Sequence, residues 1–334
     1  MPQSYSSSLL SSNVKSLKIA SAHSKTSPAK LGELELIRAK SHLSAFTNLQ
    51  SLTLAAVSSI ASGQPEKWLG SLAATVRKLK LSYCLLDEQS FFALLRLFTH
   101  LESLELDGNL WVYNPRIVTE GEPPTLRGSL TALEFTEDDA ESITMLDSLA
   151  IARVEYHTIV LGPNHHSTFR KFNVLLKNCG DHLKTLILTS PESGPRYDGQ
   201  AIAVGRGPDL TLDLSYCKGL VEIHGRFYHS KFEGFIPLLW TVKSPRFRRL
   251  SIFIAPPMPA IDWGAWAQLD AAVIALVGRV RARAASDMME VLFSSHTTAF
   301  AGVQLSQVKR ALPLTASDAR VSVRTEYLPL PLNR

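Results

Sequence analysis

The sequence predicts an α/β fold of stacked units: a solenoid with a curved parallel sheet on its concave side and helices on its convex side. Two observations predict it. A six-residue pattern, apolar-x-x-apolar-x-apolar, recurs along the chain, and amphipathic helical patterns lie between several copies. The end of each copy alternates with the period of a strand that buries one face. Each unit is too short to bury its apolar face alone, so neighbouring units have to stack.

The clear copies of this pattern begin between residues 14 and 183. They are VKSLKI (Val14), LGELEL (Leu31), LQSLTL (Leu49), VRKLKL (Val76), LESLEL (Leu101), LTALEF (Leu130), IARVEY (Ile151) and LKTLIL (Leu183). Their spacing varies from 17 residues (14 to 31) to 32 residues (151 to 183). DLTLDL (Asp209–Leu214), FRRLSI from Phe247 and MMEVLF from Met288 are interpreted as diverged copies. We therefore expect about ten or eleven units.

Helices are predicted where apolar residues recur at three- and four-residue spacing between the copies. The stripes are Phe91, Leu94, Leu95 and Phe98; Ile143, Leu146 and Leu149; and Phe169, Phe172, Leu175 and Leu176. Asp87 is placed to cap the first helix, and Gly180 lies where the third one ends. Pro237 is expected near a helix start, and a long helix is expected in WGAWAQLDAAVIALVGRVRARA from Trp263.

The chain is expected to form a single repeat domain. Residues 1–13, which include SYSSSLLSS, are expected to be disordered or a truncated N-terminal cap. Residues 14–334 are expected to form one solenoid whose repeats diverge into a C-terminal cap from about residue 255. The Gly- and Pro-rich segment 190–209 is interpreted as a loop insertion.

The three cysteines, Cys84, Cys179 and Cys217, are predicted to be structural. The letters LSYC occur twice, at Leu81–Cys84 and at Leu214–Cys217. If both copies end equivalent strands, Cys84 and Cys217 are small buried residues at corresponding positions of two distant units. That separation excludes a disulfide or a shared metal.

No motif for catalysis, cofactor binding or metal ligation is visible. The sequence contains no G-x-S-x-G, Walker A, C-x-x-C or H-E-x-x-H pattern. His165 and His166 are adjacent, but further ligands at metal-site spacing are missing. We therefore expect no enzyme, no cofactor and no metal, and an enzyme without a recognisable motif is the remaining alternative.

The net charge of +5 is a mild basic excess. The clearest basic runs are KSPRFRR (Lys243–Arg249) and RVRAR (Arg279–Arg283). They are interpreted as solvated surface, and nucleic-acid binding through them is the alternative. No apolar run reaches the roughly 18 residues of a membrane span, and no secretory signal precedes Val14. The odd, widely spaced cysteines favour an intracellular protein, cytoplasmic or nuclear. The protein is expected to be monomeric.

The extended pattern L-x-x-L-x-L-x-x-N/C resembles leucine-rich repeats. LKLSYC and LDLSYC match its end, with Cys84 and Cys217 at the N/C position. Over roughly residues 14–300 the chain resembles the cysteine-containing subclass found in F-box proteins. The resemblance implies protein–protein recognition on the concave face, as in substrate recognition by an SCF-type ubiquitin ligase. An F-box segment is not visible, so a Skp1-type adaptor is an expected partner only if an F-box lies upstream of Met1.

The predicted solenoid also suggests a partner-binding surface. The residue between the two inward residues of each copy is expected to face solvent on the concave side. This column comprises Lys18, Glu35, Thr53, Lys80, Glu105, Glu134, Glu155, Ile187 and Asp213. Glu105, Glu134 and Glu155 fall on successive copies, and Asp107 is close to Glu105. We interpret these four acids as a binding site for a basic segment of a protein partner; the alternative is a tolerated surface pattern, partly offset by Lys78 and Arg153.

Overall fold

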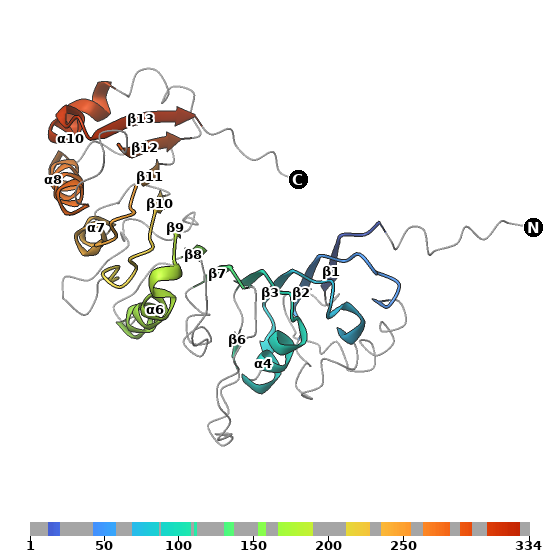
Figure 1. The fold of residues 1–334 in the computed structure, drawn as a ribbon. Coiled ribbons are helices and arrows are strands. Elements are labelled where there is room, and N and C mark those ends of the chain that lie inside the picture. Colours follow the sequence, from blue (N-terminus) through green and yellow to red (C-terminus); the bar gives the residue numbers. More distant parts are fainter. Residues whose placement is uncertain are drawn as a thin grey trace, which may run out of the picture. The chain divides into compact units, whose positions relative to one another are not determined.

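The fold, a computed structural model, is an α/β architecture whose chain divides into two compact units, residues 1–150 and 151–334 (Figure 1). We call them the N-terminal and C-terminal units and describe each by itself. The structure describes residues 13–20, 43–57, 69–86, 88–107, 110–111, 130–136, 153–157, 166–189, 212–227, 235–254, 263–280, 288–295 and 306–327.

The described part of the N-terminal unit is built on a five-stranded parallel sheet whose strands pair in sequence order. The strands are β1 (Ser16–Ala20), β2 (Ser51–Ala55), β3 (Lys78–Ser82), β5 (Ser103–Asp107) and β7 (Ala132–Thr136). Each one falls on a predicted copy of the six-residue pattern, so these strand predictions are confirmed. The copy at Leu31 lies outside the described residues.

The register of this sheet explains why the pattern repeats. Its leucines pair with leucines of the next strand, which makes two continuous apolar rows under the sheet. One row comprises Leu52, Leu79, Leu104 and Leu133, and the other Leu54, Leu81, Leu106 and Phe135. All eight side chains are buried. A strand of this unit therefore buries its apolar face only because its neighbours present the same face.

Short helical elements cover the apolar rows of the N-terminal unit. The 3-10 helix η1 (Gly70–Leu72) precedes β3 on the chain, and helix α4 (Glu88–Leu97) follows β3. Phe91, Leu94, Leu95 and Phe98 are buried, as the helical stripe predicted. β4 (Leu85–Leu86) pairs in parallel with β6 (Leu110–Trp111) beside the main sheet. Asp87 and the stripe from Ile143 lie outside the described residues.

The described part of the C-terminal unit carries six parallel strands, again in sequence order. They are β8 (Arg153–His157), β9 (Thr185–Thr189), β10 (Glu222–Phe227), β11 (Arg249–Ile254), β12 (Met289–Ser295) and β13 (Val321–Tyr327). β8, β9, β11 and β12 confirm predicted copies. β10 and β13 are strands that the sequence pattern did not predict.

In the described part of the C-terminal unit, α6 (His166–Cys179), α7 (Ile236–Thr241) and α8 (Trp263–Arg279) lie where helices were expected. The 3-10 helix η3 (Gly180–His182) and α10 (Pro313–Ser317) were not predicted. Phe172, Leu175 and Leu176 are buried, and Gly180 has a φ of +43° where α6 ends. Pro237 lies in the first turn of α7. In the described part of the chain, every helix is too short or too polar to cross a membrane.

The strand expected at DLTLDL is wrong for residues 212–214, whereas residues 209–211 lie outside the described residues. Residues 212–214 are not in a strand, and the sheet is continued by β10 instead. In β10, Gly225 pairs with Leu188 of β9 and Ile252 of β11, so it occupies the last apolar position of the pattern. Glycine at that position hid the copy LVEIHG, although Ile223 is buried like Leu186 and Leu250 beside it.

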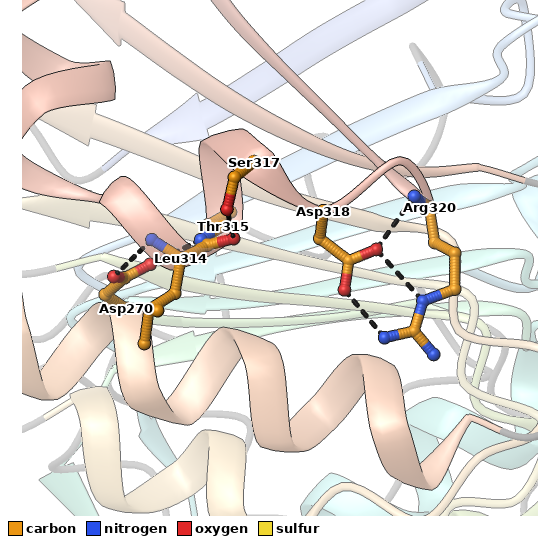
Figure 2. Close-up of polar contacts among 6 residues, drawn as sticks. All are labelled: Asp270, Leu314, Thr315, Ser317, Asp318 and Arg320. Carbon is orange, nitrogen blue, oxygen red and sulfur yellow. Dashed lines mark hydrogen bonds and ion pairs between the residues drawn. The ribbon is translucent and has the colours of Figure 1, made fainter.

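The buried carboxylate of Asp270 in α8 binds the start of α10 (Figure 2). Asp270 of α8 is only 2% exposed. It accepts hydrogen bonds from the backbone N–H groups of Leu314 (2.9 Å) and Thr315 (2.8 Å) and from the Thr315 hydroxyl (2.5 Å). A buried charge needs such donors. Asp270 therefore caps α10 and holds it against α8 ahead of β13.

Candidate functional site

The candidate site is the polar face of the N-terminal sheet, which we define as Lys80, Glu105, Asp107 and Glu134. Side chains alternate along each strand, so these residues point away from the buried leucines. Lys80, Glu105 and Glu134 pair across β3, β5 and β7 in one register. Lys18 is exposed, and Thr53, Lys80, Glu105 and Glu134 are half-buried, so these members of the predicted column lie on the face opposite the leucines, whereas a concave surface stays a prediction. Glu35 lies outside the described residues.

Lys80 is the central charge of the polar face. Its ammonium group forms an ion pair with the Glu105 carboxylate on the next strand and lies 3.9 Å from Oδ2 of Asp107. The Ser82 hydroxyl donates to Asp107 at 3.4 Å. Lys78 and Arg153 were expected to offset part of this acidic charge, but Lys80, in the same column, forms the ion pairs with Glu105 and Asp107. The reason is register, because Lys80 is directly opposite Glu105.

The polar face carries more negative than positive charge. Burial would lower the pKa of Lys80, but the hydrogen bond and charge of Glu105, with the charges of Asp107 and Glu134, outweigh it and raise that pKa above its ordinary value. Lys80 is therefore cationic at neutral pH. Three carboxylates around one ammonium group leave a surplus of two negative charges (3 − 1 = 2) on a half-buried surface.

The fourth predicted acid, Glu155, is not part of this group in the structure described. It lies on β8 of the C-terminal unit, paired with Ile187 of β9. Its side chain lies outside the described ones, so its grouping with Glu105, Asp107 and Glu134 stays a prediction.

Two further residues, Ile187 and Asp213, were wrongly predicted to belong to the solvent-facing column. Ile187 is only 5% exposed, so it does not face solvent. Asp213 is not in a strand, and its carboxylate accepts a hydrogen bond from the Ser215 N–H at 2.8 Å within a turn. The column position after Ile187 belongs to His224 of β10.

The C-terminal sheet carries a charge ladder that the sequence analysis missed. Arg249 lies 3.7 Å from Glu222 and 2.8 Å from Glu290, and Arg324 lies 3.4 Å from Glu290. The sequence does alternate acid and base at the paired positions of β10, β11 and β12. These positions can be matched only when the strand register is known, so the ladder could not be predicted from the sequence. Two acids meet two arginines in this ladder, so it offers little charge to a partner.

His224 lies beside this ladder, 3.3 Å from Glu222. Burial lowers the pKa of His224, and the positive charges of Arg226 and Arg249 lower it further. Glu222 raises this pKa, but its effect is outweighed. The imidazole is therefore neutral at neutral pH.

The two basic runs have different roles. Lys243, Arg246, Arg248 and Arg249 of the first run are exposed. In the second run, Arg279 donates to the carbonyl oxygens of Leu239 (2.8 Å) and Val242 (3.4 Å). These carbonyls lie at the C-terminal end of α7, so Arg279 caps that helix. Residues 281–283 lie outside the described residues.

All three cysteines are buried free thiols, as expected. The Cys84 thiol faces the carbonyl oxygen of Leu54 (3.3 Å), whereas the Cys217 thiol faces that of Leu176 in α6 (3.5 Å). The expectation that Cys84 and Cys217 occupy corresponding positions is wrong, because Cys217 follows a segment that is not a strand.

Burial also determines the chemistry of the thiols. It raises the pKa of Cys179 and of Cys217 to about 12, with nearby negative charges adding to the effect at Cys217. Both thiols therefore stay protonated at neutral pH and are poor nucleophiles. Among the residues that the structure describes, no group of three or more His, Cys, Asp or Glu side chains is placed to hold a metal ion.

Comparisons with known proteins leave the family open. No model of a known protein family matches the sequence, and no curated protein matches it either.

Proposed function

We propose that this chain is a leucine-rich-repeat solenoid that recognises a protein partner. The parallel strands run in sequence order in each unit, and their leucines stack in continuous rows. Helices follow strands β3, β8 and β11 on the chain. These features support a repeat architecture in which each unit contributes one strand and a connecting segment. Repeat proteins of this kind bind partners on extended surfaces of the sheet side.

The polar face is the part of this surface that we propose contacts the partner. The observation that carries the proposal is the surplus of carboxylates around Lys80. A lysine or arginine of the partner would supply the missing positive charge. Exposed ion pairs contribute only about 0.2–1 kcal/mol each. The face would thus serve partner choice and association rate more than total affinity.

The resemblance to F-box leucine-rich-repeat proteins supports a more specific version of this proposal. In that version the partner is a substrate of an SCF-type ubiquitin ligase, and Glu105, Asp107, Glu134 and Glu155 select a basic segment of it. Co-purification of the natural full-length product with a Skp1-type adaptor would support this version. Partner binding without that adaptor would leave a recognition module of another pathway.

The test compares the partners recovered with tagged full-length protein from its own cells by quantitative mass spectrometry. Replacing Glu105→Gln and Glu134→Gln removes two charges and keeps Asp107 beside Lys80. We expect recovery of the partner to fall about fivefold or more, because two pairs of about 0.5 kcal/mol or more are lost.

The matched control, Glu102→Gln with Glu326→Gln, removes the same charge from exposed or edge positions outside the polar face. It should keep the partner. Unchanged recovery in the Glu105/Glu134 variant would overturn the role of the polar face.

A further inference from the structure

We propose that single-stranded nucleic acid binds the C-terminal unit at its basic turns. We define the basic turns as residues 180–184, 215–221 and 242–248, which lead into β9, β10 and β11. This surface belongs to the C-terminal unit, whereas the polar face belongs to the N-terminal unit. The proposal therefore does not rest on the proposed protein recognition.

The three basic turns are in direct contact with one another. The Val221 N–H donates to the Lys184 carbonyl (2.8 Å), and the Arg248 N–H donates to the Val221 carbonyl (2.7 Å). The buried Ser244 hydroxyl oxygen lies 2.8 Å from the Lys218 carbonyl oxygen and 2.6 Å from that of Leu220, so its one proton is shared between these two acceptors. These bonds hold the three turns together as one surface.

Gly219 makes the first two turns especially close. A Cβ atom at this position would lie 1.9 Å from the carbonyl oxygen of Asp181. Backbone packs on backbone here. In these two turns Lys184, Tyr216 and Lys218 are among the side chains that remain exposed, beside buried Leu183, Cys217 and Leu220.

The basic turns carry a row of exposed cations: Lys184, Lys218, Lys243, Arg246 and Arg248. Lys184, Lys218, Lys243 and Arg246 form no ion pair with any other residue in the described ranges. Adjacent strands of a sheet are about 4.8 Å apart, so cations before three consecutive strands span about 10 Å. With Lys177 nearby there are six cations against Asp181 and Asp213, a surplus of four (6 − 2 = 4). Unpaired cations in a row suit a phosphate backbone.

Exposed aromatic rings accompany these cations. Tyr216 lies in the same turn as Lys218 and is 47% exposed. The Lys177 ammonium group lies 5.8 Å from its ring centroid. Trp240, 48% exposed, stands at the end of α7 just before Lys243, with the Arg279 guanidinium 5.5 Å from its ring. Large rings at the surface beside cations are stacking platforms for bases.

The rings help to choose among three anionic polymers. An acidic protein segment can use the cations, but it has no base faces to stack on Tyr216 and Trp240. A duplex hides the faces of its bases in the helical stack. A single strand offers both phosphates and free base faces, so it is the ligand that uses every exposed feature of the basic turns.

The first test measures binding of labelled oligo-uridine and oligo-deoxythymidine to the full chain by fluorescence anisotropy. The variant Lys218→Glu with Arg246→Glu should bind at least about tenfold more weakly at low salt. Its slope of log K against log salt should be smaller by about 1.4, because each lost phosphate contact removes about 0.7 for single strands.

The matched control is Lys309→Glu with Arg310→Glu, two exposed cations elsewhere in the C-terminal unit. It should bind within about twofold of the original protein. An equal loss in both variants would overturn the proposal, because binding would then follow net charge alone. Thermal unfolding of each variant, followed by circular dichroism, establishes that the fold is retained.

The second test separates stacking from charge. Tyr216→Ala should weaken binding about fivefold or more while leaving the salt slope unchanged. Tyr83→Ala, which removes an exposed tyrosine of the N-terminal unit, should have no effect. An oligo-glutamate peptide or a DNA duplex that binds as tightly as the single strands, with no dependence on Tyr216, would overturn the proposal in favour of another anionic partner.

Discussion

The same four residues, LSYC, adopt two different structures in this protein. At Leu81–Cys84 the first two residues end strand β3, and Tyr83 then takes a positive φ of +52° as the chain leaves the sheet. The Tyr83 N–H donates to the Asp107 carbonyl of the next strand, at 2.9 Å. Cys84 then turns inward beneath Leu54.

At Leu214–Cys217 the segment is held by helices instead of a sheet. The Leu214 N–H donates to the hydroxyl of Thr241 in α7 (2.9 Å), and the preceding Asp213 N–H donates to Asn173 in α6 (2.7 Å). Cys217 lies under the last turns of α6. The strand follows only at Glu222.

Burial of the leucine, tyrosine and cysteine is nevertheless the same in both copies, although Ser82 is buried and Ser215 is half-buried. Leu81, Cys84, Leu214 and Cys217 are fully buried, and both tyrosines are exposed. The local sequence therefore determines that the leucine and the cysteine enter the core and that the tyrosine does not. The neighbouring elements determine whether that core lies under a sheet or between helices. Four predictions test this comparison, from the largest effect to the smallest.

The largest effect is expected at the leucines. Leu81→Ala and Leu214→Ala should each lower the free energy of unfolding by about 2–5 kcal/mol, because both remove fully buried methyl groups. Urea denaturation measures the change. Leu314→Ala, at an exposed position, should cost less than about 0.5 kcal/mol. If Leu214→Ala resembles this control, the two copies do not share a buried leucine.

Gly219 should be essential only to the second copy. Gly219→Ala should lower the free energy of unfolding by about 1–3 kcal/mol, because the new methyl group collides with the Asp181 backbone. Gly278→Ala, in α8 with no atom within 4 Å of the new Cβ, should raise it by about 0.5–1 kcal/mol. Thermal unfolding of both variants checks the signs. A harmless Gly219→Ala would contradict the close packing of the turns.

The buried thiols of the C-terminal unit should make it sensitive to alkali. In the unfolded chain Cys179 and Cys217 ionise near their ordinary pKa of 9.0, whereas burial raises the folded pKa to about 12. The stability from the protonated thiols is therefore fully present below pH 9 and is lost as the pH rises from 9 towards 12. Urea midpoints at pH 8 and pH 10 measure this loss, about 1–2 kcal/mol per thiol at pH 10.

A variant with Cys179→Ala and Cys217→Ala is the control for that pH dependence. It should be less stable at pH 8 but lose less stability between pH 8 and pH 10. An unchanged slope would mean that the two thiols do not ionise differently in the folded and unfolded chains.

The smallest effect should differ in sign between the tyrosines. Tyr83→Gly should raise the free energy of unfolding by about 0.5–1 kcal/mol, because glycine adopts a positive φ without strain. Tyr216→Gly should lower the free energy of unfolding by about 0.5–1 kcal/mol. At this position glycine relieves no strain in the folded chain, and it raises the conformational entropy of the unfolded chain. Chemical denaturation of the pair resolves the difference. Shifts of the same sign would show that the backbones of the two copies are alike.

Much of the fold could be read from local pattern. Strands such as β2 and β5 were predictable because alternating leucines have the period of a strand with one apolar face. Helices α4 and α6 were predictable from apolar stripes. β10 was not, because Gly225 fills a position where packing, rather than residue type, reveals the strand. The same limit applies to Asp213: the pattern assigned it to a strand, but residues 212–214 are not in one.

The sequence by itself determined which residues are apolar, how they alternate, and that Glu105 and Glu134 stand at the same position of successive copies. Only the tertiary structure decided which charges meet. Lys80 faces Glu105 because parallel pairing sets their register, and Lys218 joins Arg246 because the Ser244 hydroxyl holds the two turns together. The physical reason is the distance in sequence over which each property is determined. Burial follows from the chemistry of each residue, whereas an ion pair or a charged surface forms only when strands that are far apart in sequence pair in the fold.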